Sequence, residues 1–421
     1  MSLNSGRVDA PAAHAPRLQG HLPVLDGVRG LAVLLVVFFH TTHLSDQSVA
    51  GRVTWWLAGA GWTGVDLFFV LSGFLITGIL WEAKGQPYFF RNFYMRRFLR
   101  IFPLYYLALA VSFLVLPSLA GRLGLDERIT TDGATWYLLY LSNFYQLWVD
   151  TTHPILGVVW SLAIEEQFYI VWPFLIAAVS YRGAIRLCLG TIAMAMLVRV
   201  GLTLYGASLE STYVVTFCRV DSLAMGGLLA MALRHPEGLG LKAFPWMRWA
   251  AWASVPVVLA LVVLPVGPMF ELVKRTGGYT AIAVVYAVGV YKAVAVPKGH
   301  LVHRLLTTRL LLTFGKYSYA IYLIHSPLDA ILRRTVLKTP LKTVAGTDFP
   351  MQVVFYVVAA GLSLALALVS WNLFEKHMLK LKDYFPYGKP PAPVPATAQL
   401  PVAASASLPE SERTEPPARV A

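Results

Sequence analysis

The sequence predicts an all-α integral membrane protein with about ten transmembrane helices and one short interfacial or re-entrant helix. Hydrophobic residues make up 57% of the 421 residues and charged residues only 14%, whereas soluble proteins carry about 25% charged residues. Aromatic residues reach 13%, with 12 Trp, as is typical where rings line two membrane interfaces. Long apolar runs alternate with charged or Pro/Gly-rich breaks, which is the pattern of a chain that crosses a membrane repeatedly.

The individual spans follow from these runs, each long enough to cross the hydrocarbon core as a helix. One further segment, 135–148 ("TWYLLYLSNFYQLW"), is short and aromatic, so we expect it to be interfacial or re-entrant. The expected spans lie near 24–44, 64–82, 102–120, 159–179, 186–204, 214–233, 249–266, 279–296, 316–333 and 352–374.

The Lys/Arg-rich loops predict the orientation, because such loops favour the cytoplasmic side. With a cytoplasmic N-terminus and a 135–148 segment that does not span, five basic loops fall on the cytoplasmic side, and the opposite orientation misplaces all five. The basic loop 333–349 is the one exception. The net charge of +13 is therefore interpreted as positive-inside loops of a plasma (inner) membrane protein and not as nucleic-acid binding. The five loops are 82–100, 181–186, 234–248, 297–309 and the segment from 375 onward.

The two ends of the chain differ in composition from the apolar centre. Residues 1–22 are polar and lack a signal-peptide pattern, so they are expected to be a disordered cytoplasmic lead-in. Residues 379–421 are rich in Pro and Ala and are expected to be a disordered cytoplasmic tail. The remaining 23–378 form one transmembrane domain. Cys188 and Cys218 lie in apolar segments, where their spacing predicts neither a metal site nor a disulfide.

The stretch "RGLAVLLVVFFH" places ionisable residues at both ends of the first span, where they are functional candidates. Arg29 and His40 are eleven residues apart, so they share one helix face and lie about 16 Å apart along the axis. They cannot touch, but they can hold two ends of one ligand or two ligands. Arg29 could instead be an interface arginine paired with Asp26, and His40 an ordinary helix-end histidine. His43 lies one turn further on the same face, and "HTTH" is not a zinc motif.

Two further clusters place charge at the membrane. Arg97 and Arg100 in "RRFLRIFPLYY" share a helix face at the cytoplasmic entrance of the third span. They are either positive-inside charge or an arginine clamp for phosphates. In "WSLAIEEQFYIVWP", Glu165 shares the face of Leu162 and Tyr169. It is either an interfacial carboxylate that pairs with a basic loop or an intramembrane group that needs a cation or a raised pKa.

Weaker candidates recur along the other spans. Asp66 and Ser72 lie among small residues in "GWTGVDLFFVLSGFLI", and Arg219 and Asp221 begin another span, where they can pair with other intramembrane charges. In "GKYSYAIYLIHSPL" we expect structural hydrogen bonds from the polar side chains, which are those of Tyr317, Tyr322 and His325.

Six of these stretches, taken in order, resemble the membrane acyltransferase-3 family, whose members O-acylate bacterial surface sugars and some macrolides. The Arg-x10-His pattern is joined by "GVDLFFVLSGFLI", "RRFLRIFPLYY", "WSLAIEEQFY", "RVDSLAMGG" and "YSYAIYLIHSPL". A closing "NLFEKHM" is similar to the family's Glu-Lys-Pro-like ending but has His377 in place of the proline. The resemblance covers about 25–375.

The resemblance implies a function and a set of site residues. Acyl-CoA, by default acetyl-CoA, is the expected cytoplasmic donor substrate, with no permanently bound cofactor. A carbohydrate, glycolipid or cell-surface polysaccharide hydroxyl is the expected acceptor. Arg29 and His40 are implied to be essential, Arg97 and Arg100 match the family's Arg-x-x-Arg, and Glu165 matches its glutamate. Some members carry a fused extracytoplasmic hydrolase-like domain, which this chain is expected to lack, so it is expected to act alone or with an unfused partner.

His40 is suited to act as a general base on the acceptor hydroxyl, because a neutral imidazole takes up protons near neutral pH. An acyl-histidine intermediate is the other open mechanism. Glu165 is expected to orient the imidazole or to stabilise its charged form. The three arginines are expected to hold the phosphates of coenzyme A, and Arg29 either contacts that donor or only braces Asp26.

Two other classes compete with this interpretation. Intramembrane Arg, His and Glu also suit a proton-coupled transporter of a sugar or lipid-linked glycan, which would need no acyl donor. An unrelated membrane-bound O-acyltransferase lacks a comparable ordered set of motifs here.

Overall fold

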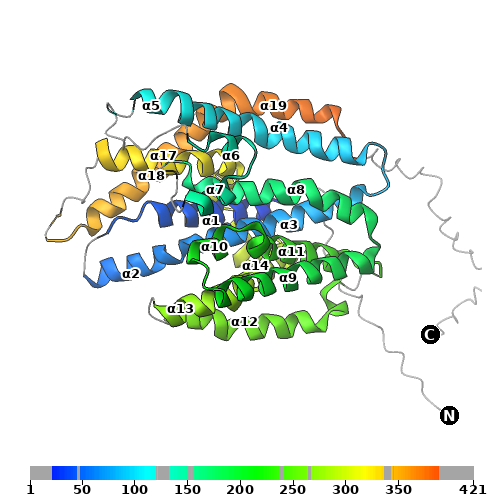
Figure 1. Ribbon diagram of the computed structural model, residues 1–421. Coiled ribbons are helices and arrows are strands. Elements are labelled where there is room, and N and C mark those ends of the chain that lie inside the picture. The colour runs from blue at the N-terminus through cyan, green and yellow to red at the C-terminus, as the bar shows by residue number, and fades with distance from the viewer. Residues whose placement is uncertain are drawn as a thin grey trace, which may run out of the picture.

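The computed structural model describes residues 21–44, 48–119, 121, 132–149, 153, 155–237, 240–263, 267–335, 343–344 and 346–387. In these ranges the chain forms a helical bundle whose long helices run roughly along one direction (Figure 1). The long helices are α1 (Pro23–His40), α3 (Gly64–Ala83), α4 (Phe89–Ala110), α8 (Trp160–Ala178), α9 (Tyr181–Leu204), α11 (Thr216–Leu233), α12 (Pro245–Val263), α14 (Tyr279–Ala295), α17 (Ser318–Thr335) and α18 (Phe349–Ser370).

Shorter helices extend or connect the long ones. Helical turns η1 (Ala60–Thr63), η2 (Val111–Val115), η5 (Lys274–Gly278) and η6 (Trp371–Glu375) continue α2, α4, α13 and α18, and η3 (Gly157–Val159), η4 (Gly240–Ala243) and η7 (Leu381–Tyr384) lie between or after helices. The short α-helices are α2 (Val49–Gly59), α5 (Leu116–Leu119), α6 (Ala134–Leu138), α7 (Ser142–Val149), α10 (Leu209–Val214), α13 (Pro268–Val273), α15 (Leu301–Leu306), α16 (Arg309–Lys316) and α19 (Lys376–Lys380).

The prediction of an all-α membrane protein is confirmed. Nine of the ten expected spans coincide with a long helix, whereas the span expected at 102–120 begins in α4 and continues through η2 and α5. Within the described ranges, seven helical stretches are long and apolar enough to cross a membrane. The other three long helices, α8, α12 and α17, carry polar or charged side chains, among them Glu165, Arg248 and His325. The seven stretches are Pro23–His40, Val49–Ala83, Phe89–Leu119, Tyr181–Leu204, Leu209–Leu233, Pro268–Ala295 and Phe349–Tyr384.

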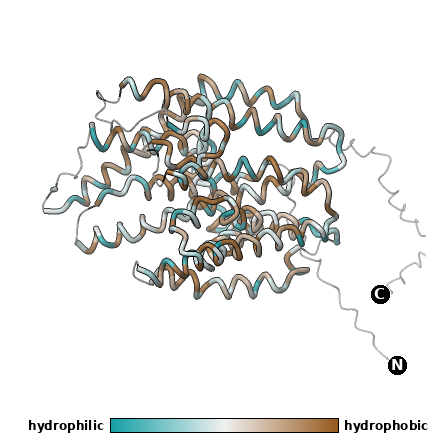
Figure 2. The backbone as a smooth tube through the Cα atoms, viewed as in Figure 1, coloured by the Kyte–Doolittle hydropathy of each residue, from teal (hydrophilic) through white to brown (hydrophobic). Residues whose placement is uncertain are grey.

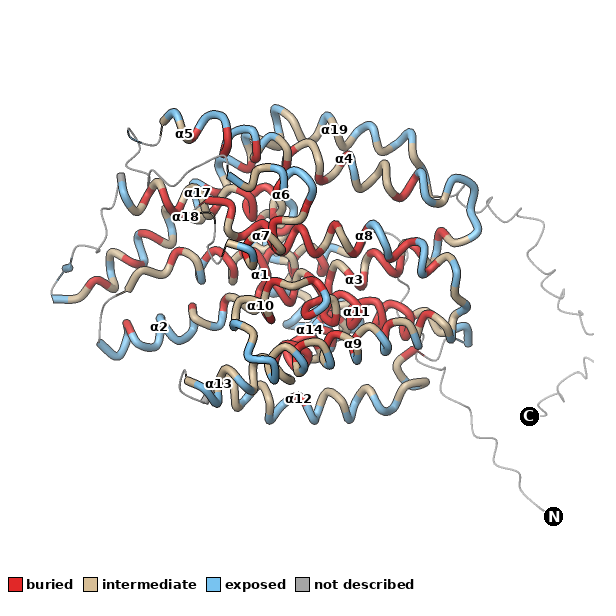
Figure 3. Tube along the Cα trace, in the orientation of Figure 1, coloured by how far each residue is buried: buried red, intermediate tan, exposed pale blue. Residues whose placement is uncertain are grey.

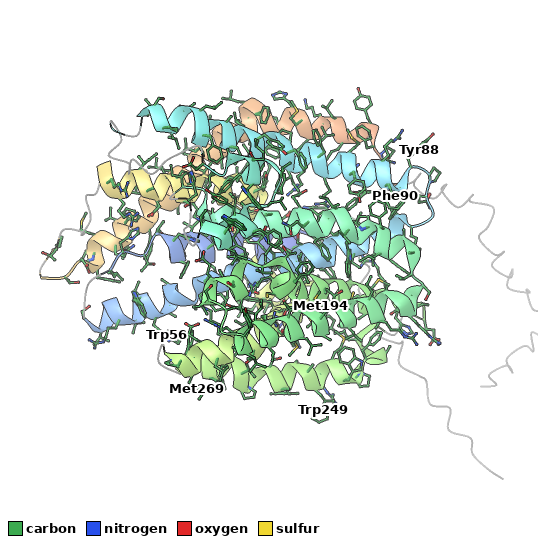
Figure 4. The ribbon with its side chains drawn as sticks, in the orientation of Figure 1. Trp56, Tyr88, Phe90, Met194, Trp249 and Met269 are labelled. Carbon is green, nitrogen blue, oxygen red and sulfur yellow. The ribbon has the colours of Figure 1, made fainter. Side chains whose placement is uncertain are left out.

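The exterior of the bundle is suited to lipid. Apolar residues colour the outer helices as well as the interior (Figure 2), and exposed side chains include Leu114 at 73% and Leu197 at 72%. Exposed aromatic residues lie toward both ends of the bundle, with Trp56 at one end and Tyr88 at the other (Figure 4). Such aromatic belts mark the two membrane–water interfaces.

Glycines set the closest helix crossings at the buried centre, which Figure 3 shows along α1, α3, α8 and α11. A Cβ added to Gly73 on α3 would lie 1.8 Å from the carbonyl oxygen of Leu223 on α11, and one on Gly226 would lie 1.9 Å from that of Val70. These two helices therefore approach backbone to backbone, as small residues permit inside membranes.

Segment 134–149 forms two short helices, as expected of an interfacial or re-entrant element. Helices α6 and α7 have five and eight residues, too few to cross a bilayer. They lie against the middle of the long helices, because Tyr105 on α4 donates to the carbonyl oxygen of Tyr137 at 2.8 Å. Gln167 on α8 donates to that of Tyr140 at 2.8 Å.

The two ends of the chain are only partly described. Residues 1–20 and 388–421 lie outside the described residues. Residues 379–387, which we expected to belong to a disordered tail, are instead folded against α4. Arg96 donates to the carbonyl oxygens of Lys382 and Phe385 at 3.1 and 3.0 Å, and Asn92 donates to that of Pro386 at 2.6 Å. Composition concealed this contact because backbone carbonyl oxygens make much of it.

Candidate functional site

Four of the five predicted site residues line one cavity inside the bundle, of about 100 Å³. Arg29 comes from α1, Arg97 and Arg100 from α4, and Glu165 from α8. We call this space the arginine cavity. Its wall also includes Ser72 from α3 and aromatic side chains from α8 and α17, namely Tyr169, Tyr319 and Tyr322.

Arg29 is held by its own helix and by the crossing of α1 with α16. Its Nη1 donates to Asp26 Oδ1 at 3.0 Å, three residues earlier, as the i,i+3 spacing predicts. On the α16 side, a Cβ added to Gly315 would lie 1.8 Å from the carbonyl oxygen of Asp26. Arg29 therefore braces Asp26 and also lines the arginine cavity, so the two alternatives for this residue are compatible.

The α4 arginines lie one turn apart and both line the cavity. The guanidinium carbon of Arg97 lies 5.6 Å from the ring centroid of Tyr169, within the range of a cation–π contact. The neighbouring Arg96 lies outside the set that lines the cavity and faces the C-terminal segment, with its guanidinium carbon 4.7 Å from the ring centroid of Tyr387. Three guanidinium groups in one cavity repel one another, which makes the space favourable for an anion.

Glu165 lies with the arginines and not with the histidine. Its face is the one predicted, because Leu162 and Tyr169 line the same cavity. The hydroxyl groups of Ser72 and Tyr169, which are hydrogen-bonded to each other, adjoin its carboxyl group. The expectation that Glu165 orients the His40 imidazole therefore does not fit the geometry. Its carboxyl group instead lines the same cavity as the three arginines.

His40 lines a second cavity, of about 590 Å³, at the end of α1 that lies away from Arg29. We call this space the histidine cavity. Its lining is polar and aromatic, with side chains from α7, α8, α10, η5 and the connection before η3. Those that carry polar or ring groups are Gln146, His153, Trp160, Glu210, Tyr213, Lys274 and Ser326.

The position of the proton on His40 follows from its neighbours. Its Nδ1 lies 2.9 Å from the carbonyl oxygen of Val36, one turn earlier. A carbonyl oxygen only accepts, so Nδ1 carries the proton in the neutral ring. The lone pair is therefore on Nε2, the atom through which the ring can take up a proton or act as a nucleophile.

His43 has a structural partner. Its Nε2 lies 2.7 Å from Asp329 Oδ1 on α17, and its backbone N–H donates to Gln352 on α18 at 2.8 Å. Although the helix period places His43 near the face of His40, α1 ends at His40. The ring of His43 is therefore directed to α17, and of the two residues only His40 is among those that line the histidine cavity.

His153 of the histidine cavity is held neutral. Its Nδ1 accepts the backbone N–H groups of Ile155 and Leu156, at 3.3 and 3.1 Å. Burial lowers the pKa of the His153 imidazole to about 4, because charging the ring would require hydration that the site does not supply. The residue is therefore suited to donate from Nε2–H and not to carry charge at neutral pH.

A thin wall separates the two cavities. Ser161 and Tyr322 line the arginine cavity. Val158 and Ser326, about one helical turn from them along the chain, line the histidine cavity. Tyr322 closes the wall, since its hydroxyl lies 2.6 Å from Ser161 Oγ and donates to the carbonyl oxygen of Val158 at 3.0 Å. The Tyr322 hydroxyl therefore joins residues that line the two cavities, Ser161 on one side and Val158 on the other.

Arg219 and Asp221 pair with other intramembrane charges, as their positions suggested. Arg219 on α11 bonds Asp66 on α3 at 2.8 Å, and Arg199 on α9 bonds Asp221 on α11 at 2.9 Å. All four side chains are fully buried, so each charge depends on its partner. Both free cysteines, Cys188 and Cys218, are buried as well.

Sequence reasoning missed most of the histidine cavity. Lys274, Glu210 and His153 lie on short helices or connections, where polar residues are common and carry no signal of their own. Their contribution depends on how the connections fold over the end of α1, which no spacing within one span reveals.

Comparison with known proteins agrees with the motif pattern. A family model described as an acyltransferase domain, that of the acyltransferase-3 family, matches residues 22–371. The Bacillus subtilis protein YrhL, named provisionally as a peptidoglycan O-acetyltransferase, is 30% identical over 86% of this chain and 56% of its own length. The Staphylococcus aureus O-acetyltransferase OatA is 27% identical over 87% of this chain and 58% of its own.

A shorter match, 35% identical over 36% of this chain and 24% of the relative, is to the Listeria monocytogenes peptidoglycan O-acetyltransferase OatA. The chain thus spans just over half the length of the first two of these relatives. No solved structure matches. The family match covers nearly the whole membrane bundle and includes Arg29, His40, the α4 arginines and Glu165. The chain belongs to the acyltransferase-3 family.

Proposed function

We propose that this protein is an integral-membrane O-acyltransferase that moves an acyl group, by default acetyl, from a cytoplasmic acyl-CoA to a carbohydrate hydroxyl. The observation that carries the proposal is the pair of cavities at different depths along α1. One contains the arginine cluster and the other contains a histidine with a basic Nε2. The names of the relatives, which specify O-acetylation, support the same reaction.

The arginine cavity is the donor site in this proposal. Guanidinium groups bind phosphates through paired N–H donors, and Arg29, Arg97 and Arg100 present three of them together. The cavity faces the end of the bundle that carries the basic loops, among them 82–100 and 234–248. These loops support a cytoplasmic N-terminus and a position in the plasma membrane.

The histidine cavity is the acceptor site. An aromatic ring can stack on a sugar face, and Trp160 and Tyr213 supply two such rings beside polar side chains that can bond hydroxyl groups. His40 Nε2 takes the proton of the attacking hydroxyl. The new O–C bond to the acyl carbon then replaces the C–S bond of the thioester, and the thiolate regains a proton from the imidazolium. Because two relatives are named for peptidoglycan, we propose a cell-wall or related surface glycan as acceptor.

The test uses the full chain, purified in lipid nanodiscs. Acetyl-CoA is supplied with and without soluble peptidoglycan fragments, while free thiol is measured and the saccharide is weighed by mass spectrometry. Transfer predicts acceptor-dependent thiol release together with one added acetyl group. Thiol release that is independent of every saccharide, or its absence with all of them, contradicts the proposal. Uptake of sugar into vesicles without an acyl donor would instead indicate the transporter.

The mechanism is tested separately. His40→Ala should abolish transfer while the protein still inserts and folds, and mass spectrometry of peptides after an acid quench distinguishes a general base from an acyl-histidine. Near-normal turnover of His40→Ala would remove His40 from the reaction under both mechanisms.

A further inference from the structure

The wall between the cavities contains a second histidine in contact with His40. His325 on α17 is 1% exposed, and its Nε2 lies 3.3 Å from His40 Nδ1. The centroids of the two rings are 5.1 Å apart. Sequence reasoning assigned His325 an ordinary structural hydrogen bond, because nothing in the chain relates position 325 to position 40.

Backbone carbonyls determine which nitrogen of each ring carries the proton. His325 Nδ1 lies 2.8 Å from the carbonyl oxygen of Tyr322 and 3.2 Å from that of Ile321. Nδ1 of the neutral ring therefore donates, and the Nε2 of His325 is left with a lone pair. That lone pair faces His40 Nδ1, which also carries a proton because it bonds the carbonyl oxygen of Val36. The His40 N–H is thus shared between one carbonyl and one imidazole.

We propose that His325 is a positioning residue for His40, an uncharged counterpart of the carboxylate that supports a catalytic histidine elsewhere. This inference rests on the proposed function, in which His40 takes the acceptor proton. By accepting from Nδ1–H, His325 holds His40 in the tautomer whose Nε2 is free to react. When His40 gains a proton at Nε2, the Nδ1–H bond to His325 becomes charge-assisted and strengthens, which stabilises the imidazolium.

The other ionisable groups near the pair do not replace His325 in this role. Asp329, one turn further along α17, would be a stronger partner for an imidazolium, but its Oδ1 is bonded by His43 at 2.7 Å. Tyr322 uses its hydroxyl for Ser161 and for the carbonyl oxygen of Val158. Further charged or titratable groups line the histidine cavity, on the side that the acceptor would occupy, and include His153, Glu210, Tyr213 and Lys274.

Two substitutions at the same position separate positioning from packing. His325→Leu fills the buried space without an acceptor, whereas His325→Gln can place an amide oxygen near the former Nε2. A hydrogen bond to a charged group accounts for about 10- to 100-fold in rate. We therefore expect His325→Leu to lose about that factor in kcat with an unchanged KM for acetyl-CoA, and His325→Gln to recover much of it. His303→Leu, on α15 and outside the residues that line both cavities, is the control.

A uniform loss of thermal stability and of kcat in both variants, with a raised KM for the donor, would show that His325 only packs the wall. Full activity of His325→Leu would also overturn the inference. Solid-state ¹⁵N NMR of histidine-labelled protein supplies a readout that needs no activity. Wild type should show His40 protonated at Nδ1, and His325→Leu should shift or mix that tautomer. If wild-type His40 is protonated only at Nε2, the inference is contradicted even when acyl transfer is confirmed. If the expected tautomer is found but no acyl transfer is detected, only the proposed function is refuted.

Discussion

Gly315→Ala is expected to lower both the stability and the activity of the protein, although Gly315 has no side chain to take part in the reaction. A Cβ at Gly315 would lie 1.8 Å from the Asp26 carbonyl oxygen and 2.6 Å from its carbon. Because ordinary contact begins near 3.4 Å, α1 and α16 must separate by about 1.6 Å. Overpacking of this kind costs about 1–3 kcal/mol. A shift of about 1 Å in a catalytic group can cost about 100-fold in rate, and Arg29 lies within one turn of Asp26.

The matched control is Gly190→Ala on α9, where an added Cβ meets nothing within 4 Å. That change should be neutral or stabilise by up to about 1 kcal/mol, because Ala favours the helix over Gly. Thermal unfolding of both variants in the same nanodiscs, followed by the thiol-release assay, makes the comparison. If Gly315→Ala unfolds at the same temperature as Gly190→Ala and keeps normal turnover, the close crossing of α1 and α16 does not hold Arg29 in place.

The remaining predictions concern the arginine cavity, the ion pairs and the histidine cavity. Arg97→Ala and Arg100→Ala should each weaken coenzyme A binding in a calorimetric titration, while the control Arg186→Ala on α9 should not. If neither α4 variant changes the affinity, the α4 arginines serve only to orient the protein in the membrane. Arg219→Met leaves Asp66 buried without its cation and should destabilise the protein by about 3–5 kcal/mol, whereas the double variant with Asp66→Leu should recover most of the loss in a thermal-unfolding comparison. Because the pKa of His153 is held near about 4, that ring does not titrate at neutral pH, so His153→Gln should leave the shape of the pH–rate profile in the neutral range unchanged. A displaced profile would show that His153 is charged there.

Much of the fold follows from the sequence because the membrane restricts what a chain can do. Each apolar run must form a helix to satisfy its backbone, so nine of the ten expected spans coincide with a long helix, to within a few residues at most boundaries. The requirement that the basic loops share one side was enough to predict that 135–148 does not cross. The contact of Lys382 and Phe385 with Arg96 was not predictable, since backbone carbonyls accept these bonds whatever the side chains are.

The candidate site was also only partly predictable from the sequence. The eleven-residue spacing of Arg29 and His40 fixed a common face and a large separation, and the structure places the two residues in different cavities accordingly. Helix periodicity also identified the face of Glu165. Periodicity within one helix says nothing about which neighbour that face meets, and Glu165 was therefore associated with His40 when its neighbours are the arginines. The contact of His325 with His40 joins residues 285 positions apart, beyond any local pattern.

The wall at Tyr322 has a consequence for the energetics of the cell. Two polar cavities that approach each other within a bilayer could conduct protons across it. The residues between the cavities then determine whether protons leak. Here that barrier is a tyrosine hydroxyl tied to Ser161 and to a backbone carbonyl, beside two rings whose Nδ1 protons are both bonded to carbonyl oxygens. In the described residues, Tyr322 and both rings each direct a proton to a backbone carbonyl oxygen, which does not pass it on. The residues that separate the donor and acceptor cavities would in this way also help to preserve the proton gradient across the membrane.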